Sequence, residues 1–184
     1  MNGLGLDEVR LIGDILGESA MRRHVKGIPR GFQTLTPCLT VHDGAQVIDF
    51  YKEAFGAQER YRMLAPDGKG IAHAELTIGD SVFMVSDEMP GQECHSPESL
   101  GGTPVGFYLY VKDVDAAFQR AVDAGATVKE PVKNEFWGDR MGTVIDPAGY
   151  YWMLATHVED VSREELTERG REAFEKMLQG AGRP

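Results

Sequence analysis

The chain has 184 residues, of which 42% are hydrophobic and 26% are charged, so it is long enough to bury the core of one compact domain. Its 29 acidic and 19 basic residues give a net charge of -10, which would repel a phosphate backbone and argues against a nucleic-acid partner. No apolar run reaches the roughly 20 residues of a membrane helix, and the two cysteines, Cys38 and Cys94, suit neither a disulfide framework nor a zinc knuckle.

Residues 1–30 are predicted to form an N-terminal helical extension. Apolar side chains recur at helical spacing in this segment, at Val9, Ile12, Leu16 and Ala20. The segment lacks the basic start and the small-residue cleavage site of a secretory signal, so we expect a soluble, cytoplasmic protein. Pro29 disfavours regular structure and marks a linker to the rest of the chain.

An internal repeat is the most informative feature of the remaining sequence. The first copy has an alternating strand pattern at 36–41, a short amphipathic helix pattern after Asp43 and a stop at Gly56. The second copy repeats this order with a strand pattern at 106–111 and a stop at Gly125. Each copy continues into further strand-like runs, so each is predicted to be a βαβββ unit.

The repeat predicts an α+β fold in which two tandem βαβββ modules form a curved mixed sheet around a cavity. A capping box at Ser162 predicts a final helix in 158–184. We expect both terminal helices to serve packing or dimerisation. The predicted boundaries are 31–157 for the domain, 33–87 for module 1, 88–103 for the linker and 104–157 for module 2.

Several short patterns resemble the vicinal oxygen chelate superfamily, which includes glyoxalase I, bleomycin-resistance proteins and extradiol dioxygenases. These patterns are Val-x-Asp at 41–43, Phe-Tyr and Phe-Gly-Ala in the first helix, and Asp-Pro-x-Gly at 146–149. Other segments are similar to the PhnB-like branch, namely 73–76, 78–81, 136–140 and 155–161. The resemblance covers residues 31 to about 170. It implies a small-molecule ligand and a homodimer.

Metal enzymes of this superfamily take ligands from the first and last strands of each module. The corresponding positions in this chain are Thr36, Met84, Gly106 and Met153. None of these is a usual ligand for a hard or borderline divalent ion, which prefers imidazole or carboxylate. We therefore expect no metal and no other cofactor, and expect Met84 and Met153 to form an apolar, adaptable floor of the cavity.

Strand alternation predicts which other side chains line the cavity. If Thr36 and Gly106 point inward, then so do Cys38, Thr40, Tyr108 and Tyr110. The aromatic candidates for stacking on a planar ligand are Tyr108, Tyr110, Trp137 and Tyr150, although such residues are more often part of a core.

Arg140 has two possible roles. Its planar guanidinium suits a clamp for a ligand carboxylate or phosphate. The alternative is a structural salt bridge to Asp139 or Glu135.

His73 and Glu75 are the candidate acid-base pair. They lie two residues apart on a predicted strand and therefore share one face, where they could move protons on a bound ligand. The alternative is a solvent-facing ladder without chemistry, since half-exposed strands alternate in this way. A noncanonical metal site on this pair would need a further ligand, for which His157 and Cys38 are candidates.

Three functions remain open from the sequence. The first is metal-independent binding of a small, partly aromatic molecule, an antibiotic or a metabolite, as in bleomycin resistance. For this function the acidic charge favours a cationic ligand. The second is a lyase, isomerase or hydrolase that uses His73 and Glu75. The third is a metal-dependent enzyme of the glyoxalase or dioxygenase kind.

Overall fold

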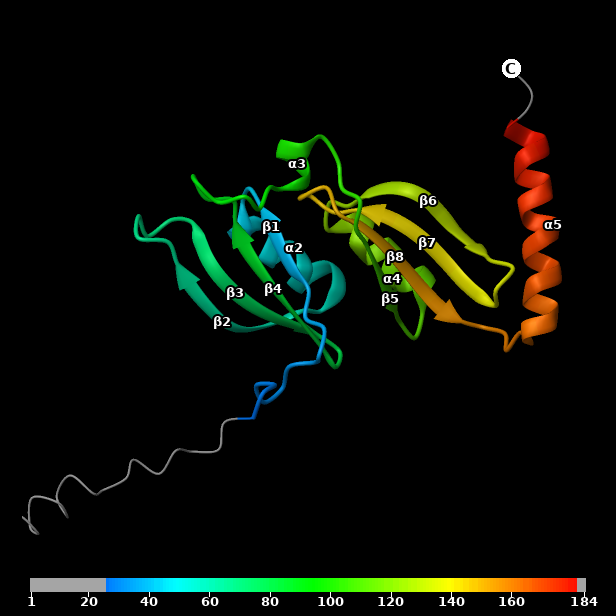
Figure 1. The fold of residues 1–184 in the computed structure, drawn as a ribbon, viewed down its shortest axis with the longest axis horizontal. Coiled ribbons are helices and arrows are strands. Elements are labelled where there is room, and N and C mark those ends of the chain that lie inside the picture. Colours follow the sequence, from blue (N-terminus) through cyan, green and yellow to red (C-terminus); the bar gives the residue numbers. More distant parts are fainter. Residues whose placement is uncertain (1–25, 182–184) are drawn as a thin grey trace, which may run out of the picture. The chain divides into compact units, whose positions relative to one another are not determined.

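The computed structural model describes residues 26–181 of the chain (Figure 1). The chain divides into two units, Met1–Thr34 and Leu35–Pro184, and every described helix and strand belongs to the second unit. The predicted N-terminal helix lies outside the described residues. Within 26–181, no helix is both long enough and apolar enough to cross a membrane.

Module 1 is a four-stranded mixed sheet with one helix packed against it. Its elements are β1 (Cys38–Val41), α2 (Gly44–Phe55), β2 (Gln58–Leu64), β3 (Ile71–Ile78) and β4 (Ser81–Asp87). The strand order is β1-β4-β3-β2, and only the β1–β4 pair is parallel. The Asp43 side chain accepts a hydrogen bond from the Gln46 amide and starts α2, and Gly56 ends it in the left-handed conformation that glycine tolerates.

Module 2 repeats this topology. Its elements are β5 (Gly106–Tyr110), α4 (Val114–Asp123), β6 (Thr127–Asn134), β7 (Asp139–Ile145) and β8 (Tyr151–His157). The order β5-β8-β7-β6, with β5 parallel to β8, matches module 1 strand for strand. The α+β class and the duplicated βαβββ unit are therefore confirmed. The two sheets remain separate, however, and do not close into one sheet.

Strand alternation holds for the first strand of module 1. Leu39 and Val41 are buried in the core, whereas Cys38, the first residue of β1, is exposed. On β3, Ala74 and Leu76 are buried as the alternation predicts. At the start of β3 the register shifts relative to β2. Alternation from Ala74 predicts that Ala72 is buried, but Ile71 is the buried residue there.

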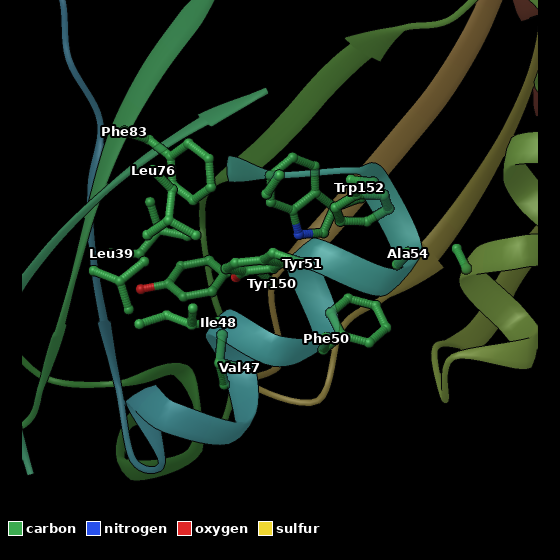
Figure 2. Packing of buried hydrophobic residues seen from close by; sticks show 14 of the residues in the cluster. Leu39, Val47, Ile48, Phe50, Tyr51, Ala54, Leu76, Phe83, Tyr150 and Trp152 are labelled. Carbon is green, nitrogen blue, oxygen red and sulfur yellow. The ribbon is translucent and has the colours of Figure 1, made fainter. Parts of the chain in front are cut away.

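The core is continuous between the two modules (Figure 2). The Trp152 ring of module 2 lies 4.5 Å from the Phe55 ring and 5.4 Å from the Tyr51 ring of module 1, measured between centroids. The buried Asp146 carboxylate accepts hydrogen bonds from the Tyr51 hydroxyl at 2.7 Å and the Trp152 indole at 2.8 Å. The Asp-Pro-x-Gly turn thus supplies a buried acceptor that links the modules.

The linker between the modules contains one short helix, α3 (Pro97–Leu100), and a final helix follows module 2, α5 (Arg163–Ala181). The predicted cap of α5 is present, since the Ser162 hydroxyl accepts from the Glu165 amide. Arg169 of α5 pairs with Glu159, and Phe174 packs edge-on against Phe136 in the turn before β7.

Candidate functional site

A cluster of polar aromatic side chains surrounds the buried Asp139 carboxylate at the start of β7. Its Oδ2 accepts hydrogen bonds from the hydroxyls of Tyr108 at 2.7 Å and Tyr110 at 3.0 Å, and from the Trp137 indole at 3.2 Å. Its Oδ1 is 2.8 Å from Nδ1 of His157 at the end of β8. We call these five residues the Asp139 cluster. Three members, Tyr108, Tyr110 and Trp137, were predicted ligand residues.

These hydrogen bonds shift the pKa values of the cluster. Burial disfavours the charged form of Asp139, but the bonds led by that from His157 outweigh it and lower the pKa of this carboxyl. Desolvation and the bond to Asp139 raise the pKa of Tyr108, so this hydroxyl remains a donor at neutral pH. The bond to Asp139, and then the one to Asp160, raises the pKa of His157.

The tyrosines of the cluster also line a cavity of about 460 Å³ beside the edge strand β5. The centroids of their rings lie 5.1 Å apart, and the exposed fractions of Tyr108 and Tyr110 are 40% and 62%. The other lining residues come from the end of α2, the β3–β4 turn, β5 and the two residues after it, α4 and β8; they are Phe55, Ile78–Ser81, Leu109, Val111, Lys112, Ala117, Arg120 and Leu154. We call this space the β5 cavity. Its size lies within the usual range for small-molecule sites.

The positions that carry metal ligands in related enzymes do not fit a metal here. Met84 and Met153 offer only thioethers, and Gly106 has no side chain. A Cβ atom on Gly106 would lie 2.9 Å from the Met153 methyl carbon, so Met153 covers this position. Within 26–181, no three His, Cys, Asp or Glu side chains are grouped as a metal site would require.

His73 and Glu75 share the open face of module 1, with the His73 Nε2 3.7 Å from a Glu75 oxygen. Both side chains are partly exposed, at 30% and 22%. Glu75 pairs across the sheet with Met84, which in turn pairs with Cys38. Partial desolvation of the Cys38 thiol, together with the charge of Cys94, raises its pKa, which disfavours the thiolate that a metal would need.

Other predicted residues lie away from the cluster. Arg140 points to the helix side of β7, where Asp115 of α4 binds it through two hydrogen bonds of 2.7 and 2.8 Å. The predicted salt-bridge partners Asp139 and Glu135 were therefore wrong, because alternation places Asp139 on the opposite face. Tyr150 is buried in the core, and its hydroxyl donates to the backbone carbonyl of Thr40. Thr36 precedes β1.

Two members of the Asp139 cluster were not predicted as site residues. Asp139 was considered only as a partner for Arg140, and His157 only as an extra metal ligand. Both stand at the ends of neighbouring strands, and Asp139 pairs with His157 across β7 and β8. The run from Phe136 to Arg140 and the histidine that ends β8 were visible in the sequence, but only the register of this pair brings them together.

Comparison with known proteins gives a family and close relatives. Residues 32–154 match the model of the Glyoxalase/Bleomycin resistance protein/Dioxygenase superfamily. The uncharacterized protein Rv0887c of Mycobacterium tuberculosis is 47% identical over 135 residues, which cover 72% of this chain and 79% of that protein.

Solved structures share the fold. The Arabidopsis thaliana At5g48480 gene product is 35% identical, with a TM-score of 0.54 over 67% of this chain and 98% of its own. The PhnB protein of Bacillus cereus has a TM-score of 0.54 over 67% of this chain and 99% of its own, but at 17% identity it shows the fold alone. The PhnB-like branch therefore stays a prediction. The superfamily model spans both modules and most of the described residues, and the chain belongs to the glyoxalase/bleomycin resistance protein/dioxygenase superfamily.

Proposed function

We propose that the chain is a metal-independent protein that binds a small, partly aromatic organic molecule, an antibiotic or a metabolite, in the β5 cavity. The observation that carries this proposal is the arrangement of Tyr108 and Tyr110. Their hydroxyls are held by the buried Asp139 carboxylate, and both residues line the cavity. Aromatic side chains that are fixed before binding lose little conformational freedom when a ligand stacks on them.

The test uses naphthylmethanol as a neutral aromatic probe, followed by calorimetry or by tyrosine fluorescence. Tyr110→Ala should weaken its binding by about 1 kcal/mol, or roughly fivefold, because a stacking partner is lost. Tyr61→Ala is the matched control, since Tyr61 is a similarly exposed tyrosine on β2 that does not line the cavity. If the two substitutions weakened probe binding equally, the proposal that the site is the β5 cavity would be wrong.

An acid-base enzyme is the second candidate, because His73 and Glu75 face each other at 3.7 Å on an accessible sheet face. If this pair moves protons during turnover, Glu75→Gln should preserve ligand binding and lower kcat by about 100-fold or more. An unchanged kcat in this variant would mean that His73 and Glu75 are solvent-facing residues without a catalytic role.

Metal independence has a direct test. Purified protein dialysed without chelator should contain well under one equivalent of zinc, nickel, manganese or iron, because Thr36, Met84, Gly106 and Met153 are poor ligands. A stoichiometric ion lost on substitution of His73 or Glu75 would instead favour a metal enzyme with an unusual ligand set.

We also propose a homodimer. The open sheet faces of the single chain leave large apolar side chains exposed, including Tyr61, Met63 and Tyr110. Burial of such surface stabilises association by about 25 cal/mol per Å² before the entropic costs are subtracted. Sedimentation at micromolar concentration should give twice the 20.3 kDa mass of the chain, and a monomer would contradict the proposal.

A further inference from the structure

Two cationic residues line the β5 cavity. Lys112 is the second residue after β5, and Arg120 lies about two turns along α4. The one carboxylate among the lining residues is Asp80, whose oxygen accepts from the Ser81 hydroxyl. We propose that the ligand of this cavity is an organic anion whose carboxylate, or a similar group, binds between Lys112 and Arg120. This inference rests on the proposed function and adds the charge of the ligand to it.

The Arg120 guanidinium is held in place by the protein backbone. Its Nε donates a 2.8 Å hydrogen bond to the carbonyl oxygen of Ala54, in the last turn of α2. Carbonyls in a last helical turn lack intrahelical donors, so this bond also satisfies α2. Because Nε alone is used in contacts with the described residues, the two terminal amino groups of the planar fork remain to bind a carboxylate in a bidentate manner.

Neither cation has a carboxylate partner among the described residues, although the chain carries ten more acidic than basic groups. The contrast with three other arginines is clear, since Arg62, Arg140 and Arg169 pair with Glu59, Asp115 and Glu159. Two cations lining one cavity without an ion pair produce a locally positive potential, which an anionic ligand would neutralise.

Several other residues that line the cavity are apolar. Phe55 and Leu154 are buried, and Ala117 lies beside Arg120 on the inner side of α4. An aromatic or aliphatic body would contact these residues and Tyr108, while its charged group binds Lys112 and Arg120. The net charge of the whole chain favours a cationic ligand. Within one Debye length of about 8 Å, however, the nearest charges dominate, and two of the three charged residues that line this cavity are positive.

The experiment compares three probes of one shape: naphthoate, naphthylmethanol and naphthylmethylammonium. We expect naphthoate to bind about tenfold more tightly than the alcohol and the ammonium compound to bind most weakly. Lys112→Gln and Arg120→Gln should each reduce the affinity for naphthoate by about fivefold to tenfold and leave that for the alcohol unchanged. Glutamine retains a donor for the Ala54 carbonyl, which protects α2 in the arginine variant.

Lys129→Gln is the matched control. Lys129 lies on β6, three strands from β5 and therefore about 14 Å away. Its substitution by glutamine removes one positive charge from the chain, as Lys112→Gln does. Equal binding of naphthoate and the alcohol, or equal effects of Lys112→Gln and Lys129→Gln, would overturn the anion inference and leave the binding function intact. If none of the three probes binds at millimolar concentration, the proposed function falls together with the inference.

Discussion

At the residue scale, Asp139 organises more of the candidate site than any other side chain. It is buried, and the hydrogen bonds from four neighbouring side chains replace the water it loses. Tyr108 and Tyr110 were predicted from alternation, which requires only the strand pattern. Asp139 was not, because its side chain becomes an acceptor only when β5, β7 and β8 lie side by side.

The first prediction concerns the pKa of His157. Asp139→Asn should lower this pKa toward the ordinary value of about 6.5, because the bond to Asp139 is the main cause of its increase. Asp160→Asn is the control and should lower it less, since Asp160 is fully exposed. Proton NMR titration of the imidazole signals measures both.

The sign of the linked stability follows from the raised pKa of His157. A raised folded-state pKa stabilises the protein fully below the unfolded value and loses this effect as the pH rises through the folded value. The wild-type protein should therefore lose stability relative to Asp139→Asn as the pH rises above about 6.5. An unchanged His157 titration in Asp139→Asn would show that the imidazole does not sense this carboxylate.

At the element scale, α4 packs closely on β7, a contact that the sequence pattern does not predict. Gly142 on β7 faces the Phe118 ring of α4, and a Cβ atom there would lie 2.7 Å from a ring carbon and 2.9 Å from Val132. Glycine usually weakens a strand, but here its lack of a side chain lets the helix approach the sheet.

Gly142→Ala should therefore destabilise the protein by about 1–3 kcal/mol, since the added methyl group forces Phe118 and Val132 to move. Gly27→Ala is the control, because a Cβ atom at Gly27 meets nothing within 4 Å. Urea denaturation followed by circular dichroism measures the difference. Equal midpoints for the two variants would mean that the α4–β7 contact is looser than described.

The linker is held to module 1 by Glu88, directly after β4. Its carboxylate accepts hydrogen bonds from His95 at 2.9 Å, from the Ser96 amide at 2.9 Å and from the Ser99 hydroxyl at 2.8 Å. These bonds, the one from His95 first, lower the pKa of Glu88 to about 2. The linker, which was predicted to be irregular, is therefore anchored to Glu88 at the start of α3.

A lowered folded-state pKa stabilises the protein above the ordinary value and loses this effect as the pH falls through the folded value. The contribution of Glu88 should therefore disappear between about pH 4.5 and about pH 2. Thermal unfolding across this range should show a steeper loss of stability in the wild type than in Glu88→Gln. Glu98→Gln, which alters an exposed glutamate on α3, should follow the wild type. Parallel pH profiles for wild type and Glu88→Gln would contradict the anchoring role.

At the scale of the whole molecule, the modules share one core and should unfold together. Tyr51 of α2 is fully buried and donates to Asp146 of module 2, while Trp152 packs between Tyr51, Phe55 and Phe107. Because each module supplies part of the buried surface of the other, neither has a complete core alone.

Tyr51→Phe should cost about 1.5–3 kcal/mol, the scale of a lost hydrogen bond to a buried charged group. Tyr150→Phe is the matched control and should cost about 1 kcal/mol, since the Tyr150 hydroxyl donates to a neutral carbonyl. Far-ultraviolet and near-ultraviolet circular dichroism should report one coincident transition for each protein. Separate transitions for the two signals would show a populated intermediate and contradict cooperative unfolding of the shared core.

The sequence by itself determined the repeat, the fold class, the superfamily and the faces of the strands, because these follow from local periodicity and short turn motifs. It also grouped Tyr108, Tyr110, Trp137 and Tyr150 as stacking candidates, of which Tyr150 lies in the core. Only the tertiary structure decided that the two sheets stay separate, that Arg140 pairs with Asp115, and that Asp139 and His157 complete the cluster. Those features depend on contacts between residues 18 to 31 positions apart in the chain, and no local pattern records which of many possible partners packing will bring within hydrogen-bond distance.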